Sequence, residues 1–417
     1  MALLSLSLLV LAILIAFFKK MNAGLICIAF ALVLGHLTGF TDKQIISGFS
    51  YNLFLTLLGV TYLFSLAQSN GTLRLMAVKT LALAGDRSYL VPIFLFVFST
   101  ILSAIGPGCI PTMAIMMVFA MSLAAELKIH PAMLAAIVVL GSSGGGVSPI
   151  APTGIIGQNL CTAAGITDPV GMAFLVNGVA STALYSLVVY FVFGGHKIKS
   201  IESHMLEQKE PFNKEQKITL AGIFVMVVMV MVLHYNVGLT SFFVATILSV
   251  LGVADESKAL KLIPWGTLIL VGGVSVLINL IVKLGGIRML SEAMASIMTP
   301  ATAPSIIGLS AGLLSWVSST SGVVMPTFIP TIPGVIEAMH GQGNPVELAT
   351  CLSMISHTAG ISPMSTGGGL AIAAYTSVAQ SSHEEQQRLF ITIFMVSAGG
   401  LVFLSIMAYF GLFRWFI

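Results

Sequence analysis

The sequence predicts an all-α membrane protein built from two inverted-topology repeats. Three observations predict this fold: an apolar composition, an internal repeat, and breaks rich in glycine and proline at matching positions of the two halves. Of the 417 residues, 57% are hydrophobic and only 8% are charged, and the mean hydropathy is +1.03. Soluble domains carry about 25% charged residues, so lipid is the expected solvent for most of this chain. The net charge of +3 is too small to indicate a nucleic-acid partner.

The repeat has a spacing of 214 residues. Gly146-Val147-Ser148-Pro149 returns as Gly360-Ile361-Ser362-Pro363, and His130-Pro131 returns as Asn344-Pro345. Interrupted apolar segments at corresponding positions of two halves are typical of secondary transporters and mark their binding sites.

Long apolar segments define the expected membrane spans. We expect spans at 2–18, 21–40, 51–68, 132–158, 170–194, 218–234, 239–253, 264–282, 347–375 and 389–412. Two further apolar stretches, 89–127 and 303–339, are each too long for one crossing and are interrupted near the middle. Short polar or amphipathic pieces at 71–87 and 285–299 precede them. We therefore expect two re-entrant helical hairpins, each entering and leaving on one side.

The same segments divide the chain into domains. Repeat 1 covers residues 1–195, a cytoplasmic linker covers 196–217, and repeat 2 covers 218–417. Each repeat holds one hairpin and one broken transmembrane helix, at 132–158 and at 347–375. Five spans and one hairpin per repeat give an odd number of crossings, so the second copy is expected to be inverted.

The distribution of basic residues predicts the orientation. With the linker in the cytoplasm, 14 of the 18 basic residues fall inside, and Lys43, Lys283, Arg288 and Arg414 fall outside. The positive-inside rule favours this arrangement. It predicts a multi-pass protein of the bacterial cytoplasmic (inner) membrane with both termini in the periplasm. The first hairpin then opens to the cytoplasm and the second to the periplasm.

The expected binding site lies at the breaks of the hairpins and broken helices. No Asp, Glu, Lys or Arg is placed near the midplane, so a proton relay would have to rely on His357. The breaks offer hydroxyls and freed carbonyls, which can bind a cation such as Na⁺. They also offer helix N-termini, which can hold an anion.

The candidate site residues follow from these breaks. For the substrate we expect Gly106, Pro107, Gly108, Ser148, Thr153, Ser319, Thr320, Ser321, Ser362 and Thr366. For Na⁺ we expect Ser103, Gly106, Gly144, Ser148, Ser318, Ser321, Thr358 and Ser362. Glycine and serine in spans also serve helix packing. His357, whose counterpart in the first half is Ser143, is either a cavity-lining or a proton-coupling residue.

Cofactor and enzyme chemistry are not expected. The four cysteines are scattered and show no spacing for zinc or for a disulfide framework. No pair of catalytic side chains stands at helical spacing toward one cavity, so the protein is predicted not to be an enzyme, with no catalytic residues. Na⁺ as coupling ion is the one bound ion expected.

Several stretches give the chain a resemblance to the MatC-type dicarboxylate carriers, over roughly the first 160 residues. The stretches are Lys20–Leu25, Phe54–Phe64, Asn70–Thr72, Ile105–Gly108 and Ser148–Gly154. The whole chain resembles the ion-transporter superfamily, whose members have two re-entrant hairpins and two broken helices in inverted repeats. Related divalent-anion/sodium symporters carry Ser-Asn-Thr at each hairpin tip. This chain departs from that pattern, with Ser318-Ser319-Thr320-Ser321 at one tip and Ser103-Ala104-Ile105-Gly106 at the other.

The resemblance implies a secondary active transporter, a Na⁺ symporter of a small organic dicarboxylate such as malonate, malate or succinate, acting as a homodimer. The expected partners are therefore the organic anion, Na⁺ or H⁺, the lipid bilayer and a second copy of the chain. Two alternatives stay open: the membrane subunit of a TRAP-type transporter, and a proton-coupled sugar-acid permease. A passive channel is disfavoured, because inverted repeats with closed hairpins favour alternating access.

Overall fold

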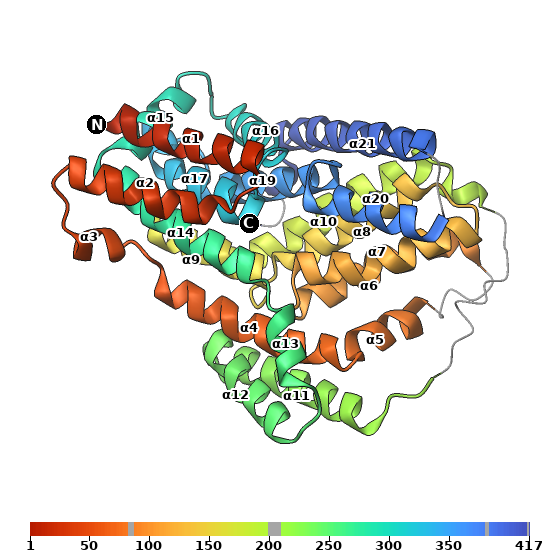
Figure 1. The fold of residues 1–417 in the computed structure, drawn as a ribbon. Coiled ribbons are helices and arrows are strands. Elements are labelled where there is room, and N and C mark those ends of the chain that lie inside the picture. The colour runs from red at the N-terminus through yellow and green to blue at the C-terminus, as the bar shows by residue number, and fades with distance from the viewer. Residues whose placement is uncertain (82–86, 199–209, 380–382, 415–416) are drawn as a thin grey trace.

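Every secondary-structure element that the computed structural model describes is a helix or a helical turn, and the described residues contain no β-strand. The structure describes residues 1–81, 87–198, 210–379, 383–414 and 417, so residues 199–209 of the predicted linker lie outside the described residues. The helices lie side by side, with α1, α16 and α21 along the upper side of the view and α4, α11 and α12 along the lower side (Figure 1).

The helices of the first half recur in the same order in the second half. The first half holds α1 (Ala2–Lys19), α2 (Ala23–Leu37), α3 (Asp42–Ile46), α4 (Tyr51–Ser69), α5 (Thr72–Leu81), α6 (Val91–Ala104), α7 (Cys109–Glu126), α8 (Pro131–Gly146), α9 (Pro152–Ala163) and α10 (Val170–Val192). The second half holds α11 (Lys214–Met231), α12 (Val237–Val250), α13 (Glu256–Leu262), α14 (Trp265–Lys283), α15 (Gly286–Ala295), α16 (Ala303–Ser315), α17 (Met325–Phe328), α18 (Ile332–Ala338), α19 (Pro345–Thr358), α20 (Thr366–Ala379) and α21 (His383–Tyr409). Helices that start at residues 23, 51, 72, 131 and 152 are matched by helices that start at 237, 265, 286, 345 and 366, each 214 residues later.

Several helices are suited to a bilayer. Among the described residues, six are long and apolar enough to cross a membrane: α1, α4, α7, α10, α14 and α21. The prediction of an all-α membrane protein is confirmed, and the chain is a multi-pass membrane protein. The inversion of one half relative to the other stays a prediction.

The two apolar stretches predicted as hairpins are each divided by a sharp turn. In the first, α6 and α7 are joined by residues 105–108, where Gly106 and Gly108 have φ angles of 141° and 79°. In the second, α16 is followed after residues 316–319 by a π-helical turn, Thr320–Val324, and the two arms are bent by 120°. A side chain at a φ of this sign is strained, so the first turn requires glycine.

The two predicted broken spans each consist of two helices. The first ends as α8 at Gly146 and resumes as α9 at Pro152; the second ends as α19 at Thr358 and resumes as α20 at Thr366. Proline can occupy the first position of α9, because the backbone N–H groups of the first helical turn have no intrahelical acceptor and proline lacks only that N–H.

Two short helices were not predicted. α3 begins with a capping box, in which the Thr41 hydroxyl accepts from the Gln44 N–H and the Gln44 side chain accepts from the Thr41 N–H. α13 is capped by Asp255, the residue before its first turn, whose carboxylate accepts from the Lys258 N–H at 3.1 Å. Such caps stabilise helices that are too short to show an apolar period.

Helices of one half pack on helices of the other half at two places, where glycines face each other. We call these places the glycine crossings. α2 packs on α14 of the other half, and α12 packs on α4. At the first crossing, a Cβ added to Gly273 would overlap the backbone of Gly24; at the second, one added to Gly59 would overlap the backbone of Gly238. The pairs are equivalent by the 214-residue spacing, and glycine allows both pairs of helix backbones into contact.

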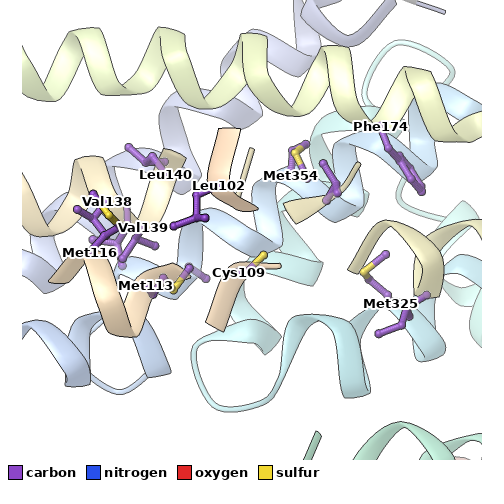
Figure 2. Close-up of a cluster of buried hydrophobic side chains, with 14 of the residues drawn as sticks. Leu102, Cys109, Met113, Met116, Val138, Val139, Leu140, Phe174, Met325 and Met354 are labelled. Atoms are coloured by element: carbon purple, nitrogen blue, oxygen red, sulfur yellow. The ribbon is translucent and has the colours of Figure 1, made fainter. Parts of the chain in front are cut away.

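The core of the first half joins the hairpin to α8. Leu102 of α6, Met113 and Met116 of α7 and Val138 and Leu140 of α8 gather beside Cys109 (Figure 2). All five are at most 5% exposed. This packing holds the first hairpin against the helix that carries the first break.

Candidate functional site

A cavity of about 280 Å³ lies where the hairpin turns and the helix breaks of both halves meet. We call it the central cavity. Its walls also include Leu57 and Thr61 of α4 and Thr267 and Leu268 of α14. No Asp, Glu, Lys or Arg of the described residues lines it, and apart from His357 the side chains around it are mostly hydroxyl-bearing or apolar.

Four helical segments begin at the central cavity. Their first residues line it: Cys109 and Ile110 of α7, Pro152 and Thr153 of α9, Thr320 and Ser321 of the π-helical turn, and Thr366 and Gly367 of α20. Neither α7 nor α9 has a side-chain cap at its start. The first N–H groups of a helix have no intrahelical partner, and the N-terminal end of the helix dipole is positive. The cavity therefore favours negative charge although no Lys or Arg of the described part of the chain lines it.

The hydroxyls at the first hairpin turn serve the fold. Ser103 Oγ donates to the Ser142 carbonyl at 2.7 Å, and Ser148 Oγ donates to the Ala104 carbonyl at 2.6 Å. Both side chains are at most 2% exposed. They attach the turn to the α8–α9 break and do not line the cavity.

The hydroxyls at the second hairpin turn line the cavity. Ser319 Oγ accepts from the Gly322 N–H at 3.1 Å, and Ser318 Oγ donates to the Leu314 carbonyl at 2.8 Å. Thr320 Oγ1 donates to the Ser356 carbonyl at 3.2 Å. The Ser321 hydroxyl has no hydrogen-bond partner within the described part of the chain, so it is available to a bound solute.

The predicted site residues separate into two groups. Those that line the central cavity are Pro107, Gly108, Thr153, Ser318, Ser319, Thr320, Ser321 and Thr366. Those that do not line it are Ser103, Gly106, Gly144, Ser148, Thr358 and Ser362.

Packing and local hydrogen bonds explain the second group. A Cβ on Gly106 would overlap the Phe64 ring, and Gly144 faces α10. Thr358 Oγ1 donates to the Met354 carbonyl at 3.0 Å, and Ser362 Oγ accepts from the Met364 N–H at 3.3 Å.

Sequence reasoning missed some wall residues. Thr61 and Thr267 come from unbroken helices, and no signal in the sequence marks them. Trp316 lies at the second turn, where its Nε1–H donates to Ser397 Oγ at 2.9 Å. His357, expected as a cavity-lining or proton-coupling residue, does line the cavity, and so does Ser143, which occupies the equivalent position of the first half.

His357 is held in one orientation. Its Nδ1 donates to the Ser353 carbonyl at 2.7 Å, which leaves Nε2 as the other ring nitrogen for a solute or a proton. Ser143, the equivalent residue of the first half, also lines the cavity, and its Oγ is buried and has no hydrogen-bond partner among the described residues. A cation bound here would depend on carbonyl and hydroxyl oxygens, because no group of three His, Cys, Asp or Glu gathers in the described part.

Residues 1–146 match the family model for the N-terminus of the dicarboxylate carrier protein MatC. This match confirms the resemblance carried by the first part of the chain. No curated protein sequence matches the chain.

The fold is similar to those of two solved transporters. The YdaH transporter of Alcanivorax borkumensis has a TM-score of 0.61 at 12% identity, over 90% of this chain and 88% of that one. MtrF of Neisseria gonorrhoeae, from a class of antimetabolite efflux pumps, has a TM-score of 0.56 at 16% identity, over 92% and 84%. At these identities the likeness concerns the fold alone. The proteins that this chain is similar to are transporters and not enzymes.

Proposed function

We propose that this protein is a secondary active transporter that carries a small organic dicarboxylate, such as malonate, malate or succinate, together with Na⁺. The observation that carries the proposal is the convergence of four described helical N-termini on a cavity that no Asp, Glu, Lys or Arg of the described residues lines. The family match over residues 1–146 supports the substrate class. The cavity volume of about 280 Å³ suits a small metabolite, because pockets for drug-sized ligands span about 300–1,000 Å³.

A co-transported cation follows from electrostatics. A dicarboxylate brings a charge of about −2, whereas a helix end carries only a partial charge whose stabilising effect, about 0.3–2 kcal/mol, fades within the first turn of the helix. A Na⁺ ion bound a few ångströms away would compensate much of the remaining charge, since Coulomb attraction is much stronger in a partly desolvated site than in water. Substrate affinity should therefore rise with Na⁺ concentration, and Na⁺ affinity should rise equally with substrate.

The test is uptake into proteoliposomes. Labelled malonate, succinate and gluconate are offered with a Na⁺ gradient and with choline in its place. We expect uptake of a dicarboxylate that requires Na⁺. Preference for gluconate would indicate a sugar-acid permease, and uptake that requires an added binding protein would indicate a TRAP-type subunit.

Proton coupling is the second candidate function, and one observation favours it. His357 is a titratable side chain in the wall of the central cavity. If uptake proceeds equally in choline and follows a pH gradient, His357→Gln should abolish that pH dependence. Under Na⁺ coupling the same variant should retain the Na⁺ requirement.

For the assembly we propose a homodimer in the bacterial cytoplasmic membrane with both termini in the periplasm. Cysteines placed at Met205, which lies outside the described residues, and at Gln342 should react with impermeant reagents from opposite sides of the membrane. Reaction from one side would contradict the inverted arrangement. Native mass spectrometry of the purified protein tests the dimer.

A further inference from the structure

A second cavity of about 410 Å³ lies between the α3–α4 turn, α9, α14 and the second arm of the second hairpin. It shares one lining residue with the central cavity, Ile156 of α9. Ile156 is 1% exposed and is the one described residue that borders both cavities.

The two cavities follow one another along the same antiparallel helix pair, α4 and α14. The Ser50 N–H donates to Ser275 Oγ at 3.2 Å, which sets the register of the pair. Leu53 and Val271 line the second cavity. One turn further along, Leu57 and Leu268 line the central cavity. The separation between the cavities is therefore about one helical turn, or about 5 Å.

The second cavity has a mostly apolar lining, and the polar side chains of its lining are uncharged within the described part of the chain. Asn52, Asn159 and Asn279 come from three different helices, and no Asp, Glu, Lys or Arg of the described residues lines it. Asn279 Oδ1 is buried and has no partner among the described residues. A buried acceptor without a partner is unfavourable, so water or a polar solute is expected beside it.

We propose that the second cavity is the other half of the transport path, a hydrated vestibule that the organic anion crosses, and that Ile156 is the side chain that separates it from the central cavity. The proposal rests on the proposed transport function. Thr153 of the central cavity and Asn159 of the second cavity lie on α9 on either side of Ile156. Six residues of helix span about 9 Å. A shift of α9 along α4 and α14 would therefore transfer the anion from the polar side chains of one cavity to those of the other past Ile156.

The test uses two cysteine reporters in a background where the four native cysteines, all buried, are replaced. Met364→Cys reports on the central cavity, where Met364 is 46% exposed, and Asn279→Cys reports on the second cavity. An impermeant thiol reagent is applied to either side of oriented proteoliposomes. We expect the two reporters to react from opposite sides, and we expect Ile156→Ala to make Met364→Cys reactive from both sides.

Ile155→Ala is the matched control. Ile155 is the neighbouring side chain, is equally apolar and 4% exposed, and lines neither cavity. It should leave the sidedness of Met364→Cys unchanged. If Ile156→Ala does not fold, Ile156→Val and Ile155→Val repeat the comparison with smaller changes in volume.

Three results would overturn the proposal: reaction of both reporters from one side, unchanged sidedness in the Ile156 variants, or the same loss of sidedness in the Ile155 variants. Labelling needs no substrate, so the outcome is independent of the uptake assay. Failure of dicarboxylate uptake with sidedness as expected would reject the proposed substrate and leave the separation at Ile156 standing.

Discussion

The two hairpin turns occupy equivalent places in the repeat but are built differently. At the first, residues 106–109 are buried and the backbone passes through two glycines with positive φ. At the second, none of the residues 316–321 is buried, no residue has a positive φ, and hydroxyls line the cavity. The first turn is fixed by packing and presents backbone N–H groups, whereas the second presents side chains.

This difference predicts different roles for the two hairpin turns. A turn that is fixed by the Ser103 and Ser148 hydroxyls can orient a helix N-terminus but cannot adapt to its ligand. A turn with an available hydroxyl, as at Ser321, can adapt its hydrogen bonds to the ligand. We therefore expect changes at the first turn to affect folding and changes at the second to affect substrate affinity.

Gly106→Ala should have the largest effect. Its φ of 141° is unfavourable for alanine, and the added Cβ would overlap the Phe64 ring. Gly39→Ala is the matched control, because Gly39 has a φ of 80° with nothing within 4 Å of the added Cβ. The backbone cost at Gly39 is about 1–2 kcal/mol, and Gly106→Ala should exceed it clearly. Thermal unfolding in detergent measures both, and equal losses would show that the turn is not fixed by packing.

A pair of serine variants compares the two turns directly. Ser321→Ala should weaken substrate binding by about 1–3 kcal/mol if the hydroxyl donates to a carboxylate, with little change in unfolding temperature. Ser103→Ala should lower the unfolding temperature, because it leaves the buried Ser142 carbonyl without its donor, and should leave the affinity of folded protein unchanged. Isothermal titration together with melting curves separates the two effects. The reverse pattern would place the adaptable turn in the first half.

The smallest expected effect is on unfolding temperature, and it comes from the N-terminal cap of α8. His130 Nδ1 caps α8 by accepting the Ala132 N–H at 3.2 Å, while its counterpart Asn344 caps α19 with an amide oxygen. Desolvation lowers the pKa of His130. The cap is therefore present at neutral pH and is lost as the pH falls through that lowered pKa, because a protonated ring cannot accept.

His130→Asn should keep the cap and remove this pH dependence, a difference of about 1 kcal/mol. The measurement is the unfolding temperature of wild type and variant between pH 7 and pH 5. Parallel curves would show that protonation of His130 does not affect α8.

Much of the fold could be predicted because glycine and proline punctuate apolar runs. The turn at residues 105–108 and the break before Pro152 follow directly from those residue types. α3 and α13 could not be predicted, since 5 and 7 residues show no apolar period. Their formation depends on caps such as Thr41, and a sequence identifies a residue as a cap only where the start of a helix is already expected.

The site could be predicted only in part, because a sequence marks a hydroxyl but not its direction. Ser148 and Ser321 both stand at breaks, yet one donates to the Ala104 carbonyl and the other lines the cavity. Thr61 and Thr267 come from helices without any interruption. Their approach to the cavity depends on how α4 and α14 pack, which is a property of the complete chain.

The glycine crossings have a consequence for how the protein is made. α2 finds its partner in α14, whose residues are synthesised more than 200 positions later. The first half must therefore reside in the bilayer with one face of α2 still covered by lipid until α14 has been inserted. Two halves expressed together as separate chains should accordingly be recovered as a complex, and either half expressed alone should be degraded.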